Sequence, residues 1–160
     1  MRDVRLQKGF SIIEIVVGSA IITVAGLAII LGTLSYIEIS SKNSHNVQTA
    51  LLFEETGEAI QFLRDSGWTS NIGNKTLNTA YYLSWSGSAY SLSTTPNLYQ
   101  DTYTRTVRFQ NVERDGNDSI TTSGSNDPDT RLVEIDVSWP YKGATTTIST
   151  EMLIHNVYDN

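Results

Sequence analysis

Apolar residues in this chain are concentrated in one uninterrupted run near the N-terminus. Between Ile12 and Leu34 the only ionisable residue is Glu14, and a helix of that length would extend roughly 34 Å. A bilayer core is about 30 Å thick. Cations precede the run and are almost absent just after it, Lys42 being the first; those before it are Arg2, Arg5 and Lys8. The pattern predicts one transmembrane helix with a cytoplasmic N-terminus.

A periodic pattern predicts that the helix continues from Ser35 to Asp65. Acidic and amide residues occupy much of one side of this segment, and apolar residues recur at helical spacing on the other: Val47, Leu51, Leu52, Ala59, Ile60 and Leu63. Arg64 falls in the expected last turn and Gly67 lies just beyond it, which together form a stop signal.

After residue 67 the pattern changes to short stretches typical of β-strands. Residues 82–85 and 89–92 flank a Ser-Gly-Ser turn, as in a hairpin, and 104–112 alternate less cleanly. The clearest strand is 130–139, and a turn then leads to the β-branched run 145–154, which predicts a terminal hairpin. Strands that follow a helix without alternating with further helices indicate an antiparallel sheet packed on that helix, an α+β fold.

The composition excludes several classes of function. The chain has 17 Asp and Glu against 11 Lys and Arg, so we expect no direct nucleic-acid binding, which requires basic charge facing phosphates. Without cysteine there can be no disulfide, thiol nucleophile or thiolate zinc site. The histidines, His45 and His155, belong to no metal-spaced or nucleophile motif, so we predict that the protein is not an enzyme.

Glu14 distinguishes between interpretations of the N-terminal segment. A secretory signal peptide would be cleaved after the apolar run at small residues, and Thr33-Leu34-Ser35 is a poor match. A plain membrane anchor would leave Glu14 without a partner, although a carboxylate inside a spanning helix costs up to roughly 3 kcal/mol. A third interpretation must therefore supply a cation for it.

The sequence Lys8-Gly9-Phe10-Ser11-Ile12-Ile13-Glu14 resembles the type IV prepilin signature, which has a basic residue, glycine, a bulky apolar residue and a glutamate four positions later. Resemblance to the type IV pilin and type II secretion pseudopilin family implies cleavage between Gly9 and Phe10 by a prepilin peptidase, and N-methylation of Phe10. The new α-amine, with a pKa of about 7.7–8.0, would lie one helical turn from Glu14, which could neutralise it or the amine of a neighbouring subunit.

This resemblance implies four parts: a leader at 1–9, a transmembrane and assembly helix at 10–38, an amphipathic continuation at 39–67 and a β-rich globular head at 68–160. The protein would be a structural subunit, as a major or minor pilin of a type IV pilus-like filament. Its partners would be the prepilin peptidase and methyltransferase, other subunits, an inner-membrane assembly platform and, before assembly, membrane lipid. It would begin as a single-pass membrane protein and end in a cell-surface filament or a periplasmic pseudopilus.

Two alternatives stay open beside the pilus subunit. One is a pseudopilin of a type II secretion system, and the other is a membrane-tethered extracytoplasmic binding domain that does not polymerise. The chain lacks two features common among pilins, since it has Leu31 where many have a proline and no cysteines for a C-terminal disulfide loop. Both departures leave the subtype open.

Two groups of residues in the head are candidates for ligand binding. Asp115, Asn117 and Ser119 have the alternate spacing of the first Ca²⁺ ligands in an EF-hand, although the glycine and the bidentate glutamate of that loop are missing. An ordinary turn is the competing interpretation, and we expect no other cofactor. Aromatic residues that suit either a stacking surface for glycans or core and interface packing are Trp68, Tyr81, Tyr82, Trp85, Tyr90, Tyr99 and Tyr103.

Overall fold

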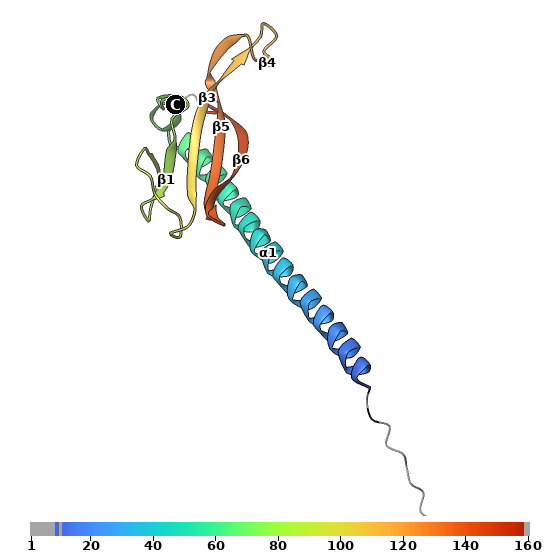
Figure 1. Ribbon diagram of the computed structural model, residues 1–160. Helices are drawn as coiled ribbons and strands as arrows, with labels where there is room; N and C mark the ends of the chain where they lie inside the picture. The colour runs from blue at the N-terminus through green and yellow to red at the C-terminus, as the bar shows by residue number, and fades with distance from the viewer. Residues whose placement is uncertain (1–8, 10, 159–160) are drawn as a thin grey trace, which may run out of the picture. The chain divides into compact units, whose positions relative to one another are not determined.

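The computed structural model describes Gly9 and residues 11–158. Its elements, in chain order, are α1 (Ile12–Asp65), the short π-helix η1 (Thr69–Gly73), β1 (Tyr81–Trp85), β2 (Tyr90–Ser93), β3 (Thr104–Arg114), β4 (Ile120–Thr121), β5 (Ser125–Tyr141) and β6 (Ala144–His155) (Figure 1). The chain divides into two compact units, and the boundary between Asn46 and Val47 lies within α1.

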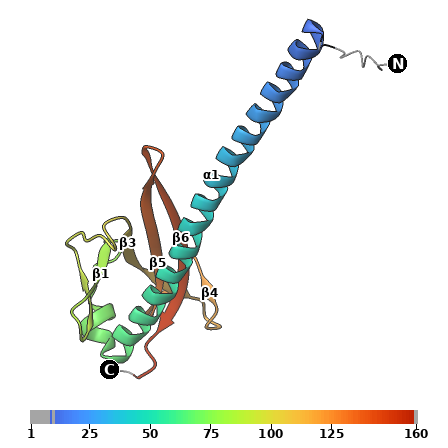
Figure 2. The ribbon, with the colours of Figure 1, turned by 90° about the horizontal axis from the view of Figure 1, so that it is seen from below.

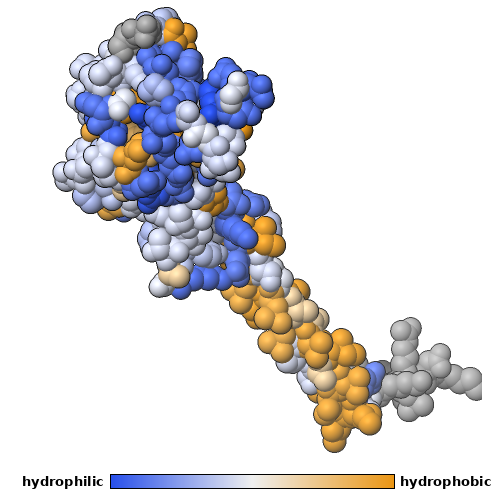
Figure 3. Space-filling view, turned by 90° about the horizontal axis from the view of Figure 1, so that it is seen from above, coloured by the Kyte–Doolittle hydropathy of each residue, from blue (hydrophilic) through white to orange (hydrophobic). Residues whose placement is uncertain are grey.

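In the first unit, α1 exposes large apolar side chains in every direction. Ile13, Ile22 and Ile29 are among the most exposed of them, and Figure 3 shows the apolar surface that such residues form. The helix is long and apolar enough to cross a membrane, and its most apolar stretch is not buried at all. A helix that is apolar all round requires lipid or other protein around it, so the predicted N-terminal segment is a candidate membrane span.

In the second unit, the remainder of α1 packs on one face of a sheet through a narrow seam. The buried residues of the seam follow one another at intervals of three and four: Thr49, Leu52, Thr56, Ala59, Ile60 and Leu63. The Thr56 hydroxyl donates to the Leu52 carbonyl oxygen at 2.5 Å, so this polar group is satisfied within the helix. The prediction that Val47 and Leu51 share this face is wrong, because they fall outside the seam and are 63% and 53% exposed.

The sheet is antiparallel, with strand order β2-β1-β3-β5-β6, and β4 pairs with the end of β3 (Figures 1 and 2). Both predicted hairpins are confirmed. Trp85 pairs with Tyr90 where β1 turns into β2, and Tyr141 pairs with Ala144 where β5 turns into β6. The second turn places Lys142 and Gly143 at φ values of 51° and 80°, a left-handed pair that matches the twist of a two-residue hairpin. The α+β prediction is therefore confirmed at this level.

The two faces of the sheet have opposite character. On β5 the side chains that alternate inward are Val133, Ile135, Val137 and Trp139, and they meet β3 and the α1 seam in the core. Glu134 and Asp136 lie on the other face, where Asp136 is paired with Arg108 of β3 and accepts a hydrogen bond from the Ser149 hydroxyl of β6 at 2.6 Å. A polar ladder thus covers the face that α1 does not.

β5 begins earlier than the predicted Thr130, despite a proline. The pairing with β3 shifts from Asn111 opposite Arg131 to Val112 opposite Asp127, so the residues between them have no partner in β3. Pro128 falls among these extra residues, where its missing N–H leaves no ladder bond unmade. The irregularity extends the strand to Ser125 and redirects it beside the loop that follows β3.

Candidate functional site

Two of the residues predicted for processing and assembly, Gly9 and Glu14, are among the described residues. Gly9 is exposed, whereas Phe10 and the leader residues 1–8 lie outside the described residues. Glu14 is exposed in the first helical turn, where its backbone N–H donates to the Ser11 carbonyl oxygen at 3.0 Å. A carboxylate in the first turn interacts favourably with the helix dipole.

The predicted calcium ligands form a tight turn after β3. One oxygen of Asp115, Oδ1, accepts the backbone N–H groups of Asn117 at 2.8 Å and Ser119 at 3.0 Å. Asp118 adopts a left-handed backbone with φ of 63°, as aspartate tolerates in turns. The structure therefore brings Asp115 to Asn117 and Ser119 through their backbones. Among the described residues, no three His, Cys, Asp or Glu side chains are grouped so as to hold a metal ion.

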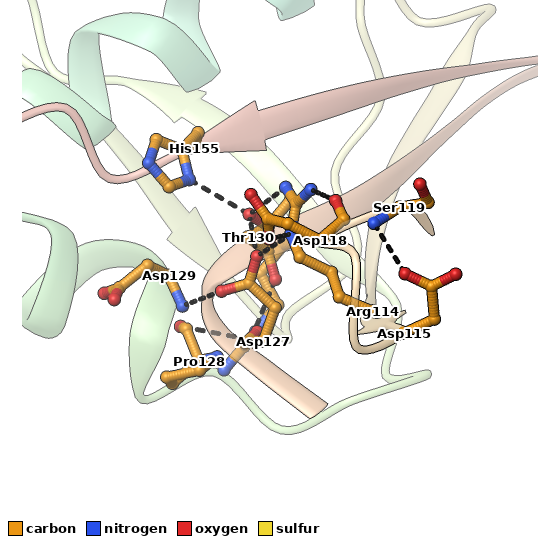
Figure 4. A network of polar contacts seen from close by, with 10 residues as sticks. Arg114, Asp115, Asp118, Ser119, Asp127, Pro128, Asp129, Thr130 and His155 are labelled. Carbon is orange, nitrogen blue, oxygen red and sulfur yellow. Dashed lines mark hydrogen bonds and ion pairs between the residues drawn. The ribbon is translucent and has the colours of Figure 1, made fainter. Parts of the chain in front are cut away.

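A polar network that no sequence pattern predicted is centred on Arg114, at the end of β3 (Figure 4). Its Nε donates to Asp127 Oδ2 at 2.6 Å and lies 3.5 Å from Asp118 Oδ1, while Nη1 donates to the Asp118 carbonyl oxygen at 2.9 Å. One guanidinium thus ties the loop after β3 to the irregular start of β5. The network borders an open depression of about 890 Å³.

Thr130 and His155 extend this network to β6. The Thr130 hydroxyl donates to Asp127 Oδ2 at 2.6 Å, and His155 Nδ1 lies 3.0 Å from the same hydroxyl oxygen. The two contacts hold the Thr130 side chain between a carboxylate and an imidazole.

The network lowers the pKa of Asp127 from 3.8 to about 2. The largest cause is the hydrogen bond from Arg114, followed by the one from Thr130, and the backbone N–H of Asp129 adds a third at 2.9 Å. All three favour the ionised carboxylate over the neutral acid. The same contact raises the pKa of Arg114 above its usual value.

A close backbone approach holds the loop against β3. A Cβ atom added to Gly124 would lie 2.2 Å from the Arg114 carbonyl oxygen, so only glycine fits there without a shift of the backbone. The Gly124 N–H donates to Glu113 Oε2 at 2.9 Å. The loop between Asp115 and Gly124 is thus closed by contacts at both ends.

No family model matches the chain, and neither a curated protein nor a solved structure matches it. The fold and site define a class by themselves: an α+β protein with a candidate N-terminal membrane helix and an antiparallel sheet.

Proposed function

We propose that this chain is a structural subunit of a type IV pilus-like filament, made as a precursor, cleaved after Gly9 and methylated on the amine of Phe10. One combination carries the proposal. The signature from Lys8 to Glu14 runs into the first turn of a helix whose apolar side chains find no cover within their own unit. A filament core built from such helices would provide that cover.

The helix needs a different apolar environment at each stage of the proposed pathway. Lipid would surround it before assembly, and the helices of neighbouring subunits would surround it afterwards. Gly18, Gly26 and Gly32 lie along this helix, and the chain itself leaves open space beside each of them. Small residues on apolar helices let neighbouring backbones approach closely.

Glu14 sets the register of the incoming subunit in this proposal. Cleavage would free an amine on Phe10 with a pKa of about 7.7–8.0, which is largely cationic at neutral pH. Pairing with Glu14 of a neighbour would align the two helices to within about one turn, roughly 5 Å. Any other register would leave both charges unpaired in apolar surroundings, which is strongly unfavourable.

The partners follow from this pathway. They are a prepilin peptidase with methyltransferase activity, an inner-membrane assembly platform and further copies of the subunit. The cytoplasmic N-terminus would place the head outside the membrane before assembly, and the head would end on a cell-surface filament or a periplasmic pseudopilus. A net charge of −6 favours protein partners over direct nucleic-acid contact.

The alternative of a membrane-tethered binding domain that does not polymerise is favoured by the depressions on the head, one of which has a volume of about 890 Å³. A tether, however, gives Glu14 no role, and an acid without a role is rare in a spanning helix. The filament subunit, as a pilin or a pseudopilin, is therefore preferred.

The test is a Glu14→Val variant expressed in cells that assemble filaments from this subunit. We expect the variant to be inserted in the membrane and cleaved normally, and to be absent or strongly depleted from sheared filaments. Mass spectrometry should find N-methyl-Phe10 at the mature N-terminus.

The matched controls are Glu38→Val, which removes another acid from the same helix, and Glu14→Asp, which keeps the charge. We expect Glu38→Val to assemble, and Glu14→Asp to assemble better than Glu14→Val. Normal incorporation of Glu14→Val would refute the role in register, and a mature N-terminus after Leu34 would refute prepilin processing altogether.

A further inference from the structure

A second depression lies on the head, between α1, the β1–β2 hairpin and the segment that leads into β3. Its volume is about 390 Å³. All the residues that line it belong to the second unit. The polar and aromatic side chains among them are Glu55, Trp85, Tyr90, Asn97, Tyr99 and Arg105. It is separate from the network around Arg114 and from the apolar helix of the first unit.

Arg105 is a buried cation at this depression, and one of its donors is unused. The residue is 6% exposed, and its Nη1 lies 3.2 Å from Glu55 Oε2. The guanidinium also stacks over the Tyr99 ring, 5.5 Å from its centre. Its Nε has no hydrogen-bond acceptor among the described residues, and Nη1 has only the ion pair with Glu55. Buried donors of a charged group are normally satisfied, and leaving them unpaired is costly.

Trp85 presents an aromatic face beside these polar groups. It is 57% exposed, although tryptophan has the largest apolar surface of any residue and is usually buried for most of it. Its pairing with Tyr90 across the hairpin holds the indole in place, with ring centres 4.7 Å apart. A fixed indole at the edge of a polar depression is a stacking platform, because its position is set before any ligand arrives.

Asn97, another residue that lines the depression, is held in place by β1. Its Nδ2 donates to the Leu83 carbonyl oxygen at 3.1 Å and to Ser84 Oγ at 2.9 Å, so its orientation is set by the β1 strand. The turn that follows carries Gln100 and Asp101 with φ of 50° and 54°. Residues other than glycine rarely adopt this left-handed backbone conformation, and it is kept only where the surrounding structure holds it in place.

The charges restrict the ligand to a neutral molecule. An anion drawn to Arg105 would lie beside Glu55, and a cation drawn to Glu55 would lie beside Arg105. Hydroxyl groups suit a site with both charges, since a hydroxyl can donate to the Glu55 carboxylate and accept from the Arg105 guanidinium. A molecule with several hydroxyls and one apolar C–H face could also stack on Trp85, as a pyranose ring does.

We propose that this depression binds a neutral sugar, a hexose or an N-acetylhexosamine, stacked on Trp85 and hydrogen-bonded to Glu55 and Arg105. The site is on the head, so the proposal does not depend on whether the chain forms filaments. It adds a recognition function to the structural one.

The experiment is a titration of the full-length ¹⁵N-labelled chain in amine-oxide micelles, a detergent without a sugar head group. The probes are the methyl β-glycosides of glucose, galactose and N-acetylglucosamine, and the readout is the indole N–H resonance of each tryptophan. We expect at least one glycoside to shift the Trp85 resonance saturably, while those of the buried Trp68 and Trp139 move less. AMP, which pairs an aromatic base with a phosphate, is a competing probe.

Variants locate the site. Trp85→Ala should weaken binding about tenfold, because it removes the stacking surface, and Arg105→Lys should weaken it while keeping the charge opposite Glu55. Tyr158→Ala removes an equally exposed aromatic residue outside the depression and should bind as the unmodified chain does. Circular dichroism confirms that each variant is folded. The proposal is overturned if no glycoside shifts Trp85, if Trp85→Ala binds normally, or if AMP binds more tightly than every glycoside.

Discussion

Replacing Asp127 with asparagine tests whether the Arg114 network stabilises the head. The substitution keeps the size of the side chain and removes the charge that accepts from Arg114 at 2.6 Å and from Thr130 at 2.6 Å. The folded-state pKa of Asp127 is lowered from 3.8 to about 2. One pKa unit corresponds to about 1.4 kcal/mol, and solvent in the open depression screens the charges, so we expect the ionised carboxylate to contribute about 1–2 kcal/mol.

The pH dependence has a definite sign. Because the folded-state pKa is the lower one, the contribution of Asp127 is fully present above pH 3.8 and is lost as the pH falls towards about 2. Urea unfolding followed by tryptophan fluorescence at a series of pH values measures the free energy of unfolding. Asp127→Asn should be less stable than the unmodified chain at pH 7, and the difference should shrink steadily between pH 4 and pH 2.

The difference between the two proteins isolates Asp127 from the other carboxylates that titrate in the same range. Asp129→Asn is the matched control, since Asp129 lies two residues away and its side chain accepts from Asn156 at 3.3 Å instead of from a cation. A stability difference for Asp127→Asn that stays constant from pH 7 to pH 2 would refute the reasoning. Asp127 would then stabilise the head through the packing and hydrogen-bond geometry of its side chain, and not through its charge.

Three further predictions rest on thermal or urea unfolding of single variants. Gly124→Ala should lose roughly 1–3 kcal/mol, since its Cβ would lie 2.2 Å from a backbone oxygen, whereas Gly116→Ala in the same loop meets nothing within 4 Å and should change stability by less than about 0.5 kcal/mol. Equal effects would contradict the close approach. Ile60→Ala should lose about 2–5 kcal/mol because the side chain is fully buried, and Val47→Ala, on the exposed side of α1, should be nearly neutral. A large loss at Val47 would mean that this side is packed after all. The melting temperature should be the same in calcium and in chelator, because Asp115 already accepts two backbone N–H groups; a rise with calcium that Asp115→Ala abolishes would establish a cation site.

The sequence predicts the elements that local signals define. Arg64 and Gly67 mark the end of α1, which the structure places at Asp65. Strict alternation marks the inward residues of β5, such as Ile135 and Val137, because a strand with one buried face repeats every two residues. Both hairpins also follow from short turn sequences between two extended runs.

Features that depend on distant partners could not be predicted in the same way. The seam of α1 uses Thr49 and Thr56 in place of Val47 and Leu51, and only the path of the helix over the sheet decides which side is covered. Pro128 argues against a strand unless the local pairing is known to be irregular. The Arg114 network joins residues from β3, β5 and β6, and no spacing along the chain marks them as neighbours.

The position of β5 between β3 and β6 has a consequence for the order of folding. β5 pairs with β3 on one side and β6 on the other, yet it begins only at Ser125 and its second partner ends at His155. During synthesis, β1, β2 and β3 emerge first, and β3 then lacks the strand with which it shares its longest ladder. At that stage the seam of α1 also has no complete sheet on which to pack. Folding of the head must therefore wait until β6 has been made, and a chain truncated before β6 would expose β5 as a long, unpaired edge prone to aggregation.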